Sequence, residues 1–193
     1  MNVDINKYYR EAAVSFYRIK QFNTHIRTSI LSAPTSFSSE DIKYMNDCIH
    51  AMITGQCRSI SNRLTKKIVN FRGFDYHTAA MCHKASDRQS KSNKEHCVPV
   101  SKIHDWILGI STPYDVKGLV CRDENDIYIF LVQNFVIAHV TPEEHSKLKP
   151  HQMPPDWLWT NPDKMGRYDL AEPKIEYFPF GERICPHCGL DPV

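Results

Sequence analysis

The segment FVIAHVTPEEHSKL, residues 135–148, constrains the fold more tightly than any other part of this chain. Its first six residues are mostly β-branched or aromatic, which favours a strand. Thr141 then has the properties of an N-cap, Pro142 stands at the first helical position, and Glu144 completes a capping box. The sequence therefore predicts a strand that passes directly into a helix.

The N-terminal part of the chain is predicted to be helical. Apolar residues recur at three- or four-residue steps over 5–31, which is typical of an amphipathic helix. After a Ser/Pro-rich break at 32–39, a second helix is expected from residue 40 to about residue 54, where Gly55 would end it. A third helix is expected over about 59–70.

The middle of the chain mixes helix and strand signals. The polar stretch 84–95 predicts a loop, and HCVPV at 96–100 predicts a short strand that Pro99 restricts to a sheet edge. Residues 101–109 predict a helix that ends at its glycine. The run at 124–134 fits a helix or a strand equally well.

These elements predict an α+β protein of 193 residues in three parts. Residues 1–75 would form a helical N-terminal region, and residues 76–150 a mixed core with an inserted helix. Residues 151–193 would form an irregular C-terminal tail.

The cysteines and apolar runs indicate a cytoplasmic protein. Seven cysteines at scattered spacings do not resemble the disulfide framework of a secreted protein. The longest apolar run, 127–140, is too short to span a bilayer and contains Gln133 and Asn134. The N-terminal residues lack the apolar segment of a signal peptide. We therefore expect a soluble protein without a membrane partner.

Positive charge is concentrated in residues 58–94, where only Asp75 and Asp87 oppose it. A basic block of this kind suits the phosphate backbone of a nucleic acid, because cationic contacts release condensed counterions. The alternative is a solvated helix face followed by a solubilising loop. The basic residues are Arg58, Arg63, Lys66, Lys67, Arg72, Lys84, Arg88, Lys91 and Lys94.

Two polar features carry candidate chemistry: the adjacent pair Glu95-His96 before an apolar segment, and His145 in the first turn of the predicted helix. A carboxylate and an imidazole can hold a divalent metal ion, and a second imidazole can take a proton from water near neutral pH. Neighbouring residues on a strand point to opposite sides, so either member of the pair could face the metal. The alternative is that the pair ends a polar loop and that His145 is a partly exposed helix residue.

Together, NKEHCVPVSKIHDWIL and FVIAHVTPEEHSKL resemble the HNH-type nucleases of the ββα-metal fold, and most closely their phage-borne members. The resemblance covers about residues 76–150. It implies that His96 is the general base, and that Glu95 and His145 are ligands of Mg²⁺ or another divalent metal. The middle Asn of the family signature has no clear counterpart, and Asn134 and Thr141 are its candidates.

The motif CPHCG near the C-terminus is a candidate half of a structural zinc site. Two cysteines separated by two residues can reach one ion, and a following glycine eases the turn. Cys82 and His83 are candidates for the remaining ligands of Cys185 and Cys188. A redox dithiol and a plain turn are the alternatives.

The sequence thus predicts a metal-dependent endonuclease that hydrolyses phosphodiester bonds in DNA, with His96 activating water. We expect double-stranded DNA as the partner. Because one catalytic unit cuts one strand, a homodimer would be needed to cut both. The alternative is a non-catalytic module that binds nucleic acid or protein, for example a phage protein that blocks a host defence factor.

Overall fold

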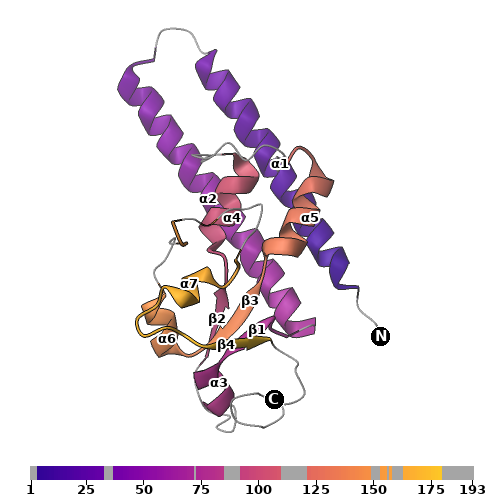
Figure 1. Cartoon of the computed structure of the whole chain (residues 1–193). Helices are drawn as coiled ribbons and strands as arrows, with labels where there is room; N and C mark the ends of the chain where they lie inside the picture. The colour runs from indigo at the N-terminus through magenta and orange to yellow at the C-terminus, as the bar shows by residue number, and fades with distance from the viewer. Residues whose placement is uncertain are drawn as a thin grey trace. The chain divides into compact units, whose positions relative to one another are not determined.

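The computed structural model describes residues 4–32, 37–71, 73–84, 92–109, 121–148, 153–155, 157 and 163–179. The chain is α+β, mostly helical with one four-stranded sheet, which confirms the predicted class (Figure 1). It divides into a helical unit, residues 1–67 and 104–131, and a sheet unit, residues 68–103 and 132–193. Within the described residues, no helix has the length and apolar character needed to cross a membrane.

Two long helices, α1 (Ile5–Leu31) and α2 (Ser39–Phe71), run side by side in the helical unit (Figure 1). The predicted bounds of α1 are confirmed. The expected break in α2 at Gly55 is wrong, because the helix continues through this residue. The buried side chains of α2 explain this: Ile53, Cys57, Ile60 and Leu64 follow one another at helical spacing across the glycine. Burial along this stripe outweighs the cost of about 1 kcal/mol for glycine inside a helix.

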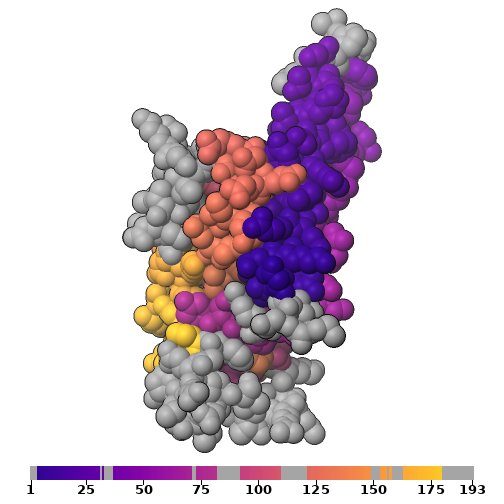
Figure 2. Space-filling view, turned by 90° about the vertical axis from the view of Figure 1, so that its right-hand side faces the viewer, coloured from indigo at the N-terminus to yellow at the C-terminus, as the bar shows by residue number. Residues whose placement is uncertain are grey.

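Shorter helical segments complete the helical unit. The ambiguous run at 124–134 forms helix α5 (Glu124–Asn134), and Figure 2 shows α5 beside the N-terminal half of α1. The guanidinium of Arg10 in α1 lies 4.6 Å from the ring centroid of Tyr128 in α5. Helix α4 (Val100–Leu108) ends as predicted, at Gly109 with φ +68°.

The sheet has the strand order β2-β3-β1-β4. Its central strands, β1 (Tyr76–Thr78) and β3 (Ile137–Val140), are parallel. The edge strands, β2 (Asn93–His96) and β4 (Tyr177–Pro179), pair antiparallel with β3 and β1 respectively. Helix α3 (Ala79–Lys84) follows β1 directly.

The predicted strand at 96–100 is wrong, because β2 is the polar segment Asn93–His96 and ends where that prediction began. Cys97 and Val98 are both fully buried. The chain bends at these two residues, directly after β2, and so leaves the strand where it enters the core. Burial at this bend raises the pKa of the Cys97 thiol well above its usual range.

Part of the expected irregular tail is ordered. Residues 163–179 include the short helix α7 (Gly166–Asp169) and the edge strand β4. Tyr168 and Ile175 pack in one core cluster with Ala138 and Val140 of β3. Residues 165–175 of this segment therefore contribute to the core of the sheet unit.

Candidate active site

The antiparallel pair β2–β3 and the helix after it build the candidate site. Glu95 of β2 lies opposite Ala138 of β3, and the chain leaves β3 through Thr141 into α6 (Pro142–Lys147). The strand-to-helix junction is therefore confirmed at the predicted position. Because β2 runs beside the strand that leads into α6, the first turn of α6 lies close to Glu95.

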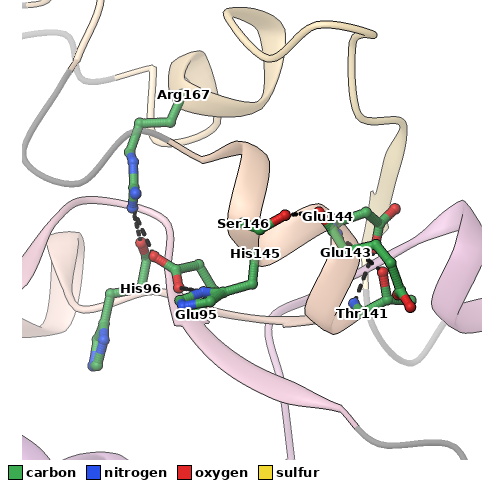
Figure 3. A network of polar contacts seen from close by, with 8 residues as sticks. All are labelled: Glu95, His96, Thr141, Glu143, Glu144, His145, Ser146 and Arg167. Carbon is green, nitrogen blue, oxygen red and sulfur yellow. Dashed lines mark hydrogen bonds and ion pairs between the residues drawn. The ribbon is translucent and has the colours of Figure 1, made fainter.

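Glu95 and His145 meet across fifty residues of sequence. The Nδ1 atom of His145 lies 2.6 Å from the Oε2 atom of Glu95 (Figure 3). The Glu95 side chain is 12% exposed, whereas that of His145 is 51% exposed. The pair thus joins a mostly buried carboxylate to an imidazole that solvent and ligands can reach.

Arg167 completes the site from α7. Its Nη1 atom donates to Oε1 of Glu95 at 2.8 Å and to the main-chain carbonyl of His96 at 2.9 Å (Figure 3). Its side chain is only 5% exposed. No motif pointed to Arg167, which lies more than twenty positions after His145. The only signal was an arginine between apolar and aromatic residues, in KMGRYDL.

Glu144 holds the first turn of α6 in place. Its backbone N–H donates to Oγ1 of Thr141 at 3.2 Å, and its Oε2 accepts from the Thr141 N–H at 3.0 Å. Both halves of the predicted capping box are present. The same Oε2 accepts from the Thr78 hydroxyl at 2.6 Å, which ties α6 to β1. Glu144 therefore positions the turn that carries His145.

The ring of His96 is not part of this cluster. Figure 3 shows it directed away from the Glu95 carboxylate, as alternation along β2 requires. The ring lies edge-on to Phe135, with centroids 4.9 Å apart. The structure thus brings Glu95 and His145 together and leaves His96 on the other face of the strand.

His139 shares the face of His96. Its ring stacks on Phe74 at 4.3 Å. Burial, followed by the nearby His77 and Lys94, lowers the pKa of His139, so its neutral form is favoured. Its neighbours make it a sheet-packing residue and keep it apart from Glu95.

The candidates for the missing Asn take different positions. Thr141 is the N-cap of α6, and Asn134 is a buried residue at the end of α5. The Thr141 carbonyl accepts a hydrogen bond from the His145 backbone N–H at 2.9 Å, so Thr141 fixes the turn that carries His145.

The described part of the basic block is exposed. Arg58, Arg63, Lys66 and Lys67 lie on α2, and Lys94 lies on β2. Arg72, Arg88 and Lys91 fall outside the described residues, as does the Lys84 side chain. The zinc prediction cannot be placed either, because Cys185, Cys188 and the side chains of Cys82 and His83 lie outside the described part.

The pair Glu95–His145 fits a hydrated hard metal ion. Carboxylate oxygen and imidazole nitrogen are both metal ligands, and these two atoms are already adjacent. Among the described residues no group of three or more His, Cys, Asp or Glu could hold an ion. Glu95 supplies the carboxylate oxygen that Mg²⁺ and Mn²⁺ prefer, and the His145 imidazole suits a first-row transition metal; the remaining positions would be left to waters and substrate phosphate. A second chemical use is equally open: Glu95 could orient His145 as a general base.

No protein-family model, curated protein or solved structure matches this chain. The function is therefore argued from the contacts of Glu95, His145 and Arg167.

Proposed function

We propose that this protein is a metal-dependent endonuclease of the HNH type, hydrolysing phosphodiester bonds in DNA. The observation that carries the proposal is the contact between Glu95 on β2 and His145 on α6. It joins two residues that the resemblance assigned to one metal, and it does so on an antiparallel strand pair followed by a helix. The partial exposure of His145 leaves the pair accessible to a phosphate group.

Glu95 and His145 would hold Mg²⁺ or a similar ion, which supplies charge neutralisation on the scissile phosphate when bound. The chain contributes a carboxylate held in place by Arg167 and an imidazole on a helical turn fixed by its capping box. Fixed ligands favour catalysis, because little reorganisation is needed when charge develops on the phosphate.

His96 is the proposed general base. The short strand β2 ends at this residue, so its ring lies at the border between the strand and the following bend. Proton abstraction from a water near Glu95 requires the His96 ring to turn from its contact with Phe135. The proposal therefore includes a side-chain rearrangement of His96 when substrate binds.

The exposed cations on α2 would bind the DNA backbone. Arg58, Arg63 and Lys66 border one open surface pocket, which also includes Gly55 and Asn62. Several cations on one helix face suit successive phosphates, whose contacts give a strong dependence of affinity on salt.

Nicking of supercoiled plasmid in Mg²⁺ or Mn²⁺ tests the proposal. The wild type is expected to nick DNA and to lose this activity with a chelator. His145→Ala and Glu95→Gln should reduce the rate by about 10²-fold or more, since each removes one of two protein ligands. His96→Ala should reduce it by about 10²- to 10⁴-fold. Equal rates for His96→Ala and wild type would remove His96 from the mechanism, and cleavage that persists in chelator would favour His145 as a metal-independent base.

A non-catalytic nucleic-acid-binding module is the second candidate. The exposed cations of α2 favour it, because they need no assembled catalytic site. It predicts DNA retention that falls steeply with salt, without nicking in any divalent metal. That result would overturn the endonuclease proposal and leave the binding function standing.

A further inference from the structure

Arg167 carries a nearly buried charge that touches both members of the Glu95-His96 pair. We propose that Arg167 is a positioning residue for the metal site, acting through Glu95. This inference rests on the proposed function, because it concerns the carboxylate assigned to the ion.

The hydrogen bonds of Arg167 favour a positioning role. Its Nη1 atom donates to Oε1 of Glu95 and to the carbonyl of His96, and so ties the carboxylate to the backbone of the next residue. The Oε2 atom is left to face His145. Arg167 thereby fixes which oxygen of Glu95 is available at the site.

The backbone around Arg167 is held firmly enough to transmit this constraint. The next residue, Tyr168, is fully buried in the core cluster of the sheet unit. The preceding residue, Gly166, approaches Pro154 so closely that an added Cβ would lie 2.6 Å from the proline Cγ atom. Only glycine fits there without a shift of Pro154 or of α7. The guanidinium therefore extends from a fixed point to a fixed carboxylate.

Groups that orient a metal ligand without touching the ion typically contribute 10- to 100-fold in metal affinity. The conservative variant Arg167→Lys keeps the positive charge beside Glu95. However, its ammonium lacks the planar fork of a guanidinium and cannot reproduce the same two contacts in fixed geometry. We therefore expect Arg167→Lys to weaken metal binding although it preserves the charge.

The test is Mn²⁺ titration of the folded full-length protein by calorimetry, together with the Mn²⁺ dependence of plasmid nicking. Lys174→Met is the matched control, since Lys174 is an exposed cation of the same segment that pairs with Asp169. Arg167→Lys should raise the Mn²⁺ concentration for half-saturation by about 10- to 100-fold. Excess Mn²⁺ should recover most of the nicking rate, and Lys174→Met should behave as wild type.

Chemical rescue provides a second readout that a loss of packing would not produce. Methylguanidinium added to Arg167→Ala should restore part of the Mn²⁺ affinity, and should leave Lys174→Met unchanged. If Arg167→Ala does not fold, Arg167→Lys decides the question.

The outcomes separate this inference from the proposed function. If the wild type nicks DNA and Arg167→Lys titrates with Mn²⁺ as the control does, the positioning role is overturned and the endonuclease stands. If the wild type neither binds Mn²⁺ nor nicks DNA, the endonuclease proposal is overturned and the role of Arg167 falls with it.

Discussion

The helical unit and the sheet unit each place an imidazole in a close polar contact, and the two contacts differ in their surroundings. In the helical unit, Nε2 of His104 lies 2.9 Å from Oγ of Ser61, and both residues are buried. In the sheet unit, Nδ1 of His145 lies 2.6 Å from Glu95, and its side chain is half-exposed. Both imidazole rings therefore make a short contact to an oxygen atom, and they differ in how far they are exposed to solvent.

Burial determines what each imidazole can do. Desolvation, followed by the nearby Arg58, lowers the pKa of His104 to about 4, so its ring is neutral at physiological pH. It packs beside Phe16 and hydrogen-bonds a hydroxyl, which makes it a structural residue. His145 is accessible and contacts a carboxylate whose other oxygen is held by a buried arginine. Accessibility, together with charged neighbours, therefore distinguishes the candidate site from a structural histidine.

The largest expected effect on folding comes from removing the carboxylate of the site. Glu95→Ala should lower the free energy of unfolding by about 3–5 kcal/mol, because it leaves the Arg167 guanidinium buried without its partner. Urea denaturation of the full-length protein measures the change. Glu95→Gln keeps an acceptor for Arg167 and should cost less. Equal stability of Glu95→Ala and wild type would show that burial of the Arg167 guanidinium does not require its ion pair with Glu95.

The second expected effect is a pH dependence of the free energy of unfolding, which arises from His104 in the helical unit. The pKa of His104 is about 4 in the folded protein against 6.5 for the free side chain. Between these two values the unfolded chain therefore binds more protons than the folded protein. The contribution of His104 to the free energy of unfolding is fully present above pH 6.5 and decreases as the pH drops toward 4. From about pH 7.5 to about pH 5 the expected loss from this residue is about 2 kcal/mol.

The variant His104→Gln isolates this contribution, because its amide can still hydrogen-bond Ser61 but does not titrate. Denaturation at several pH values should give a shallower dependence for His104→Gln than for wild type. Parallel curves for the two proteins would show that His104 is protonated equally in both states and would remove the contrast with His145.

The sequence predicted the parts of the site whose signals are local. The capping box around Thr141 predicted the start of α6. The strand that carries Glu95 and His96 was expected at 96–100, whereas β2 spans Asn93–His96. The predicted break at Gly55 was wrong, because the low helix propensity of glycine was considered without the buried stripe of α2 that continues past this residue. Arg167 was missed for a related reason: its role arises from a contact across 72 residues, which no local spacing encodes.

Gly55→Ala should produce a smaller change, of opposite sign to those above. A Cβ at this position would meet nothing within 4 Å, and the residue lies inside α2. The substitution should raise the free energy of unfolding by about 0.5–1 kcal/mol. Gly109→Ala is the control, because φ +68° is unfavourable for alanine and should make that variant less stable. A loss of stability in Gly55→Ala would contradict the uninterrupted helix.

The smallest effect on folding is expected at His145, although this residue is central to the proposed chemistry. Its side chain is half-exposed, and Glu95 keeps its hydrogen bond from Arg167 when the imidazole is removed. His145→Ala should therefore change the free energy of unfolding by no more than about 0.5 kcal/mol, as for an exposed ion pair. Plasmid nicking and Mn²⁺ binding by the same preparation should nevertheless be lost. If His145→Ala instead lowers the free energy of unfolding by well over about 0.5 kcal/mol, the imidazole contributes to packing, as that of His104 does, and the contrast between the two residues is lost.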